Sequence, residues 1–395
     1  MGKGCVVCGD KEYEVLLDLN CGGFDNSPLY ETVTVVVCKK CNHIYNLLTE
    51  SQVNGIYEYY SNEYSQANIE SPNKNGDIPG SFSNDSISRY GDLYLVVEKD
   101  IKKDSNVLDV GCAMGGLLSF LSPCCNNLFG IDSTENFVNI AQKKVKGDIK
   151  LASAESLPFA DDFFDVVFAD QVVEHLIDPN IFFREASRVL KGNGVLCISV
   201  PDVTHYRDTS FFDFYFFLMR EHVHHFCLRS LTEIANKFGF IVEHETLTFP
   251  NLISDSGRLP NLTIKFRKIG TVICSDYLID PFVLKSVKNY IQGSYTRLSE
   301  SNEEFKKIQK TNELINVYGI GREFHYLWKN TELNKCNVKL YDDTPIKQKM
   351  TVSGRPVLSS TDLDLSAKST IITSFAHINI LNRKLRSLGF QGEIL

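Results

Sequence analysis

The sequence predicts an α/β fold, and three observations support that prediction. Strand-like and helix-like segments alternate through the middle of the chain, the apolar strand Asn106–Val110 runs into a glycine-rich turn, and a second strand, Leu128–Ile131, ends in Asp132. Glycines let a backbone turn tightly and approach a ligand, while the next helix points its first amide groups at it. An acid about twenty residues beyond such a turn suits two ribose hydroxyls. The middle of the chain is therefore predicted to be a Rossmann-like nucleotide-binding domain.

Length and composition indicate a globular protein of two or three domains. The chain has 395 residues, too many for one core, and a net charge of -8. Lys and Arg are scattered, so no basic patch suggests nucleic acid. No apolar run approaches the ~20 residues that span a bilayer, and no apolar signal segment follows the start. We expect a cytoplasmic protein without nucleic-acid or membrane partners; the oligomeric state stays open, with a monomer as the simplest expectation.

Four cysteines near the N-terminus have the spacing of ligands for one metal ion. Cys5 and Cys8 form one C-x-x-C pair, and Cys38 and Cys41 form the other. Each pair can present two thiolates to a tetrahedral ion, and Zn²⁺ is the expected occupant. A four-thiolate site has no open position for water, so we expect a structural role. The alternative, four thiols without a metal, is disfavoured by the paired spacing.

Two short strands are predicted between the cysteine pairs, at Tyr13–Leu19 and Val33–Val37. They offer too little apolar surface for a core of their own, so the metal would act as a staple. A tyrosine-rich segment, Ile56–Ser65, follows. Residues 1–75 are therefore predicted to form a zinc-binding module and a linker.

The glycine-rich turn Gly111–Gly116 belongs to a series of segments. Such a loop alone is as often a dinucleotide site as anything else. Here it is followed by Asp132, by the segment Leu151–Phe159, and by the acidic turn that opens the third strand, Asp161–Phe168. The series resembles the class I S-adenosylmethionine (SAM) methyltransferases. In that family the loop holds the methionine part of SAM, the acid ending the second strand binds the ribose, and the later segment flanks the adenine.

The resemblance implies a set of SAM-binding residues in residues 76–250, the predicted SAM domain. They are Asp109, Gly111, Ala113 and Gly115 on the loop, Asp132 at the ribose, Ser153, Ala154 and Glu155 at the adenine, and Asp170 at the mouth of the pocket. Two of them depart from the family. Ala113 replaces a glycine, which requires a negative φ there, and Ser153 replaces an Asp that reads the adenine amino group. We expect SAM binding to survive, with weaker adenine contacts.

Glu174 and His175 follow the third strand in a segment that also matches the family. They can act at the site, or they can cap and orient a helix, and the sequence favours neither role.

The whole arrangement narrows the resemblance. A four-cysteine module, a tyrosine-rich linker, a SAM domain, the segment Arg220–Leu231 and a further α/β region occur together. This combination resembles the SAM-dependent sugar C-methyltransferases, which act on nucleotide-linked keto-sugars in deoxysugar pathways. It implies SAM and Zn²⁺ as cofactors and a nucleotide-linked sugar as substrate.

Glu221 and His222 are the expected catalytic residues under this resemblance. Carbon becomes a nucleophile only after loss of a proton next to a carbonyl, so the site needs a base. His222 would be that base, Glu221 would orient it or bind a substrate hydroxyl, and His225 or His224 would face the sugar. The alternative is that these histidines bridge a helix turn or bind a metal.

Two positions in this region depart from the sugar-methylating family. Met219 stands where relatives have a tyrosine, so a phenol acting with His222 must come from Tyr60, Tyr64 or Tyr215. Residues 249–257 replace the usual H-G-G-S run. We also expect Ser230 to cap a helix at Leu231–Phe238.

The last part, residues 251–395, is predicted to be a second Rossmann-like domain. A helical pattern from Asp280 is followed by a strand at Ile315, a glycine turn, and a second strand that ends in Asp342 and Asp343. In the family this domain binds the nucleotide part of the substrate. The contacts we expect are Gly319, Gly321, Lys347 and Arg383. The alternative is a docking domain without a ligand.

The sequence thus predicts a SAM-dependent methyltransferase, with C-methylation of a nucleotide-linked keto-sugar as the leading function. The first rival is an O- or N-methyltransferase of a glycan or small metabolite. The second is a binding protein that keeps the SAM fold without catalysis.

Overall fold

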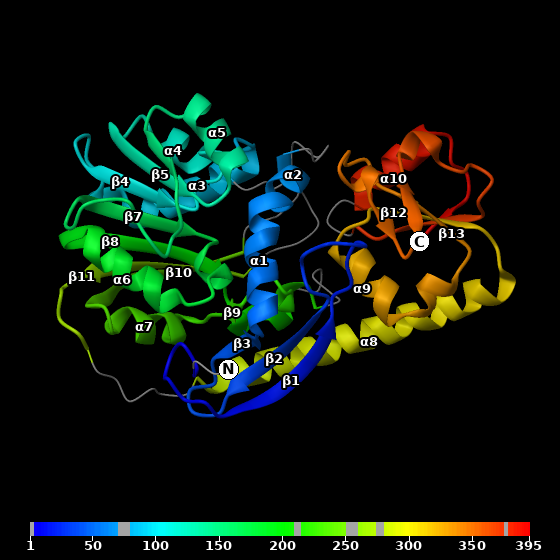
Figure 1. The fold of residues 1–395 in the computed structure, drawn as a ribbon, viewed down its shortest axis with the longest axis horizontal. Coiled ribbons are helices and arrows are strands. Elements are labelled where there is room, and N and C mark those ends of the chain that lie inside the picture. Colours follow the sequence, from blue (N-terminus) through cyan, green and yellow to red (C-terminus); the bar gives the residue numbers. More distant parts are fainter. Residues whose placement is uncertain (1–3, 70–79, 209–214, 250–259, 274–279, 375–377) are drawn as a thin grey trace.

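The computed structural model describes residues 4–69, 80–208, 215–249, 260–273, 280–374 and 378–395. Their strands form three sheets, with helices packed around them (Figure 1). The predicted α/β architecture is confirmed, with a central Rossmann-like domain and further units on either side in the sequence. Among the helices of these residues, none is long and apolar enough to cross a bilayer.

The N-terminal sheet is antiparallel, in the order β1-β2-β3-β9. Its strands are β1 (Tyr13–Asn20), β2 (Thr32–Cys38), β3 (Ile44–Leu47) and β9 (His224–His225). Because β9 comes from the central part of the chain, the module is tied to that part by strand pairing. Helices α1 (Glu50–Asn62) and α2 (Tyr64–Ile69) follow, and Thr49 starts α1 through a capping box with Gln52.

The central sheet has seven strands in the order β10-β11-β8-β7-β4-β5-β6. Strands β4 to β8 run parallel and β11 is antiparallel to its neighbours β8 and β10, the class I SAM-methyltransferase arrangement. The strands are β4 (Asn106–Val110), β5 (Asn127–Asp132), β6 (Asp148–Leu151), β7 (Phe164–Asp170), β8 (Leu190–Pro201), β10 (Phe240–Thr248) and β11 (Asn261–Lys268).

The boundary predicted at residue 250 is too early. Strand β11 lies beyond it and pairs with β8 from Asn261–Pro201 to Arg267–Val195, so the central domain extends to Lys268. Residues 250–257, where the departure from the family falls, lie outside the described residues.

Helices cover both faces of the central sheet (Figure 1). One face carries α3 (Asn84–Val97), α4 (Gly116–Leu121) and α5 (Glu135–Lys144), and the other carries α6 (Pro179–Val189) and α7 (Leu228–Asn236). Helix α7 begins a turn earlier than predicted. Its cap residue is Cys227, and the Ser230 hydroxyl lies inside the first turn, where it accepts a hydrogen bond from the Cys227 amide.

The C-terminal domain is a second Rossmann-like unit, entered through the long helix α8 (Pro281–Thr311). Its sheet order is β14-β15-β13-β12-β16-β17. The elements are β12 (Ile315–Tyr318), α9 (Arg322–Asn330), β13 (Val338–Tyr341), β14 (Thr351–Val352), β15 (Arg355–Leu358), β16 (Ser369–Ile372), α10 (Ile378–Ser387) and β17 (Glu393–Ile394).

The N-terminal module and the C-terminal domain share one apolar core. Val35 of β2, Val317 of β12 and Trp328 of α9 are all fully buried in it. Polar contacts add to this core, since the Asp25 carboxylate accepts hydrogen bonds from the Ser353 and Gly354 amides. The N-terminal module is therefore held by both of its neighbours.

Candidate cofactor and active site

A cavity of about 540 Å³ opens at the carboxyl ends of β4, β5 and β7. Ligands of open α/β sheets bind at this edge, and the size suits a small-molecule site. Its walls come from all three parts of the chain. Of the predicted site residues, it is lined by Tyr60, Tyr64, Asp109, Gly111, Ala113, Asp132, Ser153, Ala154, Glu155, Asp170, Glu221 and His222.

Asp132 organises the glycine loop. Its carboxylate accepts hydrogen bonds from the Ala113 amide at 2.9 Å and the Thr134 amide at 2.8 Å. Burial raises the pKa of Asp132, although these amides oppose the rise. The side chain therefore closes the loop and also lines the cavity at the position predicted for the ribose.

Ala113 does not have the negative φ that the sequence interpretation required. Its φ is 43°, in the left-handed region, while its amide bonds to Asp132 and its methyl group is buried. A non-glycine residue held in this region costs about 1 to 3 kcal/mol. The loop therefore keeps the glycine-type conformation and stores strain at Ala113.

Gly115 is required by the local packing of the glycine loop. It precedes α4 with φ 85°, and a Cβ there would lie 2.4 Å from the Val145 side chain. The loop packs closely on Ala141 of α5 and on Val145 at this position. At the predicted adenine end, the Ser153 hydroxyl accepts a hydrogen bond from the Glu155 amide.

Carboxylates dominate the cofactor half of the cavity. Burial, then the nearby Asp170 and Asp132, raise the pKa of Asp109 well above its usual range. Arg89 lies 3.0 Å from Asp170 and balances one of these charges. A cluster of carboxylates favours a positively charged ligand. SAM carries two positive groups, a sulfonium and an ammonium.

The other half of the cavity brings together Tyr60, His175, Glu221 and His222. The Nδ1 atom of His175 lies 2.8 Å from the Glu221 carbonyl oxygen and 3.0 Å from the Tyr60 hydroxyl. Since a carbonyl only accepts, Nδ1 carries the hydrogen and Nε2 is the acceptor. The ring centroids of His175 and His222 are 4.8 Å apart, and the two imidazoles pack edge to face.

His222 is the imidazole best placed as a base. It lines the cavity, only 9% of its surface is exposed, and its Nδ1 has no hydrogen-bond partner. Burial, and then the neighbouring His175, lower the pKa of His222 well below its usual range. The shift favours the neutral imidazole over its protonated form.

Glu221 meets a cation from the C-terminal domain. The Arg322 Nε lies 3.8 Å from its carboxylate, and Arg322 also lines the cavity. Burial alone would raise the pKa of Glu221, but the guanidinium groups of Arg322 and Arg220 outweigh burial and hold the pKa below its usual range. Glu221 is thus kept ionised by charges from two domains.

His225 does not reach the cavity. It lies on β9, paired with Ile44, and its Nδ1 is 3.2 Å from the Tyr206 hydroxyl. His224 likewise turns to His43, at 3.2 Å. The predicted role of these histidines at the sugar is wrong because β9 draws both into the N-terminal sheet.

Tyr60 is the phenol nearest the histidines. Its hydroxyl reaches His175, and Tyr64 packs against its ring at 4.9 Å. Tyr215 is buried in the core shared with the C-terminal domain, where it packs against Tyr326. Of the three predicted candidates for the phenol missing at Met219, Tyr60 and Tyr64 line the cavity, and the Tyr60 hydroxyl contacts His175.

Three cavity residues were missed or left undecided by the sequence. His175 lines the cavity; Arg89 and Arg322, which also line it, were not singled out. Arg322 had one usable signal, its place directly after the turn that contains Gly319 and Gly321. No local pattern could show that this turn faces another domain.

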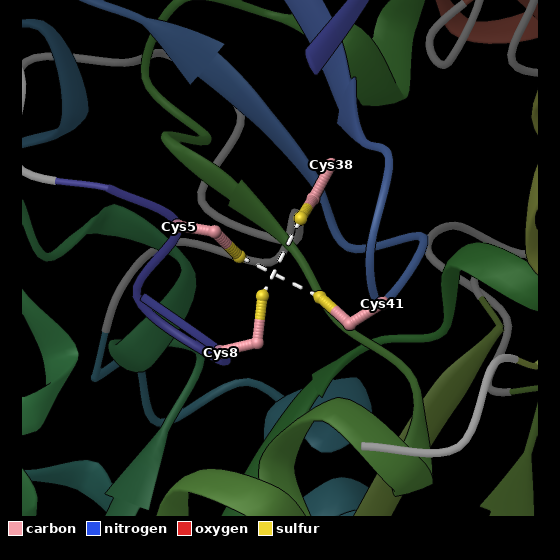
Figure 2. Close-up of side chains that lie close together, drawn as sticks. All are labelled: Cys5, Cys8, Cys38 and Cys41. Carbon is pink, nitrogen blue, oxygen red and sulfur yellow. Dashed lines mark hydrogen bonds between the residues drawn. The ribbon is translucent and has the colours of Figure 1, made fainter. Parts of the chain in front are cut away.

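Four sulfur atoms converge in the N-terminal module (Figure 2). Cys5 Sγ lies 3.6 Å from Cys41 Sγ, and Cys8 Sγ lies 3.5 Å from Cys38 Sγ. These distances are far longer than a disulfide bond. A tetrahedral ion with Zn–S bonds of about 2.3 Å has S···S edges of about 3.8 Å, so the four thiols fit a tetrahedral ion.

A second group of ligand-type atoms includes the cavity-lining residues His175 and His222 and the buried Glu174. One atom each of Glu174, His175 and His222 lie within 4.8 Å of one another. Burial raises the pKa of Glu174 to about 8, and neither carboxylate oxygen has a hydrogen-bond partner in the described structure. A metal-ligand role for His222 and a role as base exclude each other.

The nucleotide-type turn of the C-terminal domain also forms. Gly319 has φ 98°, and the Ile320 amide donates to the Asp342 carboxylate, which pairs with Lys347 at 3.1 Å. Of the four predicted contacts, Gly319, Gly321 and Lys347 gather around this turn. Arg383 lies on α10, where its Nε donates to the Asn379 carbonyl.

Comparison with known proteins identifies the central domain. Residues 108–198 match the family model described as a methyltransferase domain. A ubiquinone biosynthesis O-methyltransferase of Pelagibacter ubique is 36% identical over 110 residues, covering 26% of this chain and 44% of that protein. A probable SAM-dependent methyltransferase of Mycobacterium tuberculosis is 33% identical over 98 residues, covering 25% of this chain and 36% of that protein.

Among solved structures, a SAM-dependent methyltransferase of Mesorhizobium loti is 14% identical and has a TM-score of 0.39; the match covers 46% of this chain and 97% of that one. The chain spans less than half the length of both curated relatives. The family model falls within the central domain, which is similar to SAM-dependent methyltransferases.

Proposed function

We propose that the protein is a SAM-dependent C-methyltransferase of a nucleotide-linked keto-sugar. The observation that carries the proposal is the position of the His222 ring in the wall of the same cavity as the SAM loop, beside the His175 ring. The proposal assigns to this ring the role of a neutral base beside the methyl group of SAM. A histidine base can deprotonate a hydroxyl as well as the carbon next to a carbonyl, so carbon as the acceptor rests on the resemblance to the sugar C-methyltransferases.

In the proposed reaction, the His222 imidazole takes the proton on the carbon next to the substrate carbonyl. The electron pair left on that carbon attacks the SAM methyl group, the carbon–sulfur bond breaks, and S-adenosylhomocysteine leaves. His222 then returns its proton to water. Holding carbon and sulfonium in line supplies much of the acceleration, and Tyr60 and Arg322 are placed to stabilise the enolate oxygen.

The four cysteines are proposed to hold one structural Zn²⁺. Cys5, Cys8, Cys38 and Cys41 would be its ligands, and the closed set of four thiolates leaves no site for chemistry. Metal analysis of the purified protein should find one zinc per chain, and Cys8→Ser with Cys41→Ser should remove it. A full-length protein without stoichiometric zinc that still folds would rule this out.

The C-terminal domain is proposed to bind the nucleotide part of the substrate at the turn of Gly319 and Lys347. Its support is the parallel sheet and the left-handed glycine at the end of β12, which suit close approach of a phosphate. A docking role without a ligand would leave substrate affinity unchanged in Lys347→Ala.

The function is tested with SAM that carries a carbon-13 methyl group and a panel of nucleotide-linked keto-sugars. NMR of the product should show the label on a ring carbon adjacent to a carbonyl. Label on oxygen would instead support the O-methyltransferase alternative, for which the named relative is a precedent. Unchanged turnover in His222→Ala would also contradict the enolate mechanism, and transfer that requires added Mg²⁺ or Mn²⁺ would point to the Glu174–His175–His222 metal site.

A further inference from the structure

Asn46 connects the N-terminal module to the turn that carries Glu221 and His222. It lies on β3 and is 3% exposed. Its side-chain amide donates to two carbonyl oxygens, of Met219 at 3.1 Å and of His222 at 2.9 Å, and its backbone amide donates to the Val223 carbonyl at 2.8 Å. One side chain thus binds both ends of the turn.

The same module holds the turn at a second point. The Tyr30 hydroxyl donates to the Arg220 carbonyl at 3.0 Å, and the Arg220 guanidinium donates to the carbonyls of Gly22 at 2.6 Å and Tyr30 at 2.9 Å. Beyond the turn, β9 pairs with β3. The backbone on both sides of Glu221 and His222 is therefore anchored on residues of the N-terminal module.

Two of the four cysteines flank or lie in the connection between β2 and β3. Cys38 ends β2, and β3 starts at Ile44, three residues after Cys41. A metal held by the four cysteines would fix the connection between these strands, and so the register that presents Asn46 to the turn. The cofactor half of the cavity does not share these contacts, because Asp109 and Asp132 lie on strands of the central sheet.

We propose that Asn46 is a positioning residue for the proposed base, and that its hydrogen bonds to the turn set the geometry of proton abstraction without contributing to SAM binding. This inference rests on the proposed function. Loss of the two side-chain hydrogen bonds would let the turn shift, and a shift of about 1 Å can reduce a rate by about 100-fold.

The test separates proton abstraction from methyl transfer. The full-length protein is placed in D₂O with S-adenosylhomocysteine and the keto-sugar that it methylates, and NMR follows deuterium entering the carbon next to the carbonyl. We expect Asn46→Ala to slow this exchange about 10- to 100-fold and to leave the S-adenosylhomocysteine dissociation constant within about 2-fold. A second readout is the NMR signal of the His222 ring, assigned with His222→Gln, which should shift in Asn46→Ala.

Asn316→Ala is the matched control. Asn316 is equally buried, its amide also donates to a carbonyl, that of Asp364, and its Oδ1 also lacks a hydrogen-bond partner. It lies in the C-terminal sheet, away from the cavity, so its loss should lower stability without changing exchange or the His222 signal. Asn46→Ser keeps one donor and should retain more exchange than Asn46→Ala.

Tyr30→Phe is a milder variant that removes one anchor without a cavity, for the case in which Asn46→Ala does not fold. It should slow exchange several-fold. If Tyr30→Phe and Asn46→Ser both match Asn316→Ala in exchange and in the His222 signal, the positioning role is wrong. If the unaltered protein exchanges no keto-sugar proton, the proposed function fails, and the His222 signal alone then decides the role of Asn46.

Discussion

The two halves of the cavity are built differently. The glycine loop and the carboxylates of the cofactor half come from one continuous stretch, from Asp109 to Asp170. The acceptor half is assembled from separate segments, with Tyr60 from the tyrosine-rich helices, His222 from a turn and Arg322 from the C-terminal domain. The first half is a property of one domain, whereas the second exists only when three parts of the chain are docked.

Replacement of the proposed base should give the largest effect and confine it to the acceptor half. We expect His222→Ala to reduce turnover by about 10²- to 10⁴-fold, the usual contribution of general base catalysis. SAM affinity, measured by calorimetry, should stay within a few-fold because His222 is not part of the glycine loop. A large loss of SAM affinity would show that the two halves are not separable.

The opposite result is expected in the cofactor half for Asp132→Asn. An amide cannot accept hydrogen bonds from both the Ala113 and Thr134 amides on two oxygens, and a charge-assisted hydrogen bond contributes about 1.5 to 3 kcal/mol. SAM affinity should therefore fall about 10- to 100-fold. At saturating SAM, the KM for the acceptor should not change. An equal loss of affinity for SAM and for the acceptor would contradict the separation of the cavity into two halves.

A change at Arg322 tests the contribution of the C-terminal domain. In Arg322→Gln the pKa of Glu221 should rise, because a guanidinium that holds it down is lost. A carboxyl with a depressed pKa contributes stability above its unfolded pKa, and this is lost as the pH falls through the folded pKa. We expect the acidic limb of the pH–rate profile, and the acid unfolding midpoint, to move to higher pH. Arg322→Lys should move them less, and an unmoved profile would separate Arg322 from Glu221.

The smallest effect concerns the strained loop. Ala113→Gly should relieve the left-handed strain and raise the free energy of unfolding by about 1 kcal/mol. Gly115→Ala is the matched opposite, since it adds a Cβ at φ 85° against Val145 and should destabilise the protein. Denaturant unfolding with and without SAM measures the free energy of unfolding of each variant. If both variants were stabilised, or both destabilised, the strain argument would be refuted.

Local residue chemistry predicted the cofactor half almost completely. A strand, a glycine turn and an acid after the next strand are contiguous signals, and Asp109, Asp132 and Asp170 all line the cavity as expected. The failures were conformational. The φ of Ala113 depends on the hydrogen bond to Asp132, and the packing of Gly115 depends on α5, neither of which a local pattern contains.

The acceptor half was predicted only in part. Glu221, His222 and Tyr60 were expected from resemblance and do meet, but His225 was misplaced because its strand pairs with β3. Arg322 could not be expected, since its partner Glu221 lies in a different part of the chain. The domain boundary failed for the same reason, as β11 joins its sheet through pairing with β8.

The sequence by itself determined the nature of each part: the paired cysteines, the SAM loop with its acid, and a second Rossmann-like pattern at the C-terminus. These are set by spacing within short segments, where backbone conformation and side-chain chemistry are local. Only the tertiary structure decided which side chains share the cavity. Strand pairing and domain docking bring Asn46, His222 and Arg322 near one site, and such contacts depend on surfaces far apart in the chain.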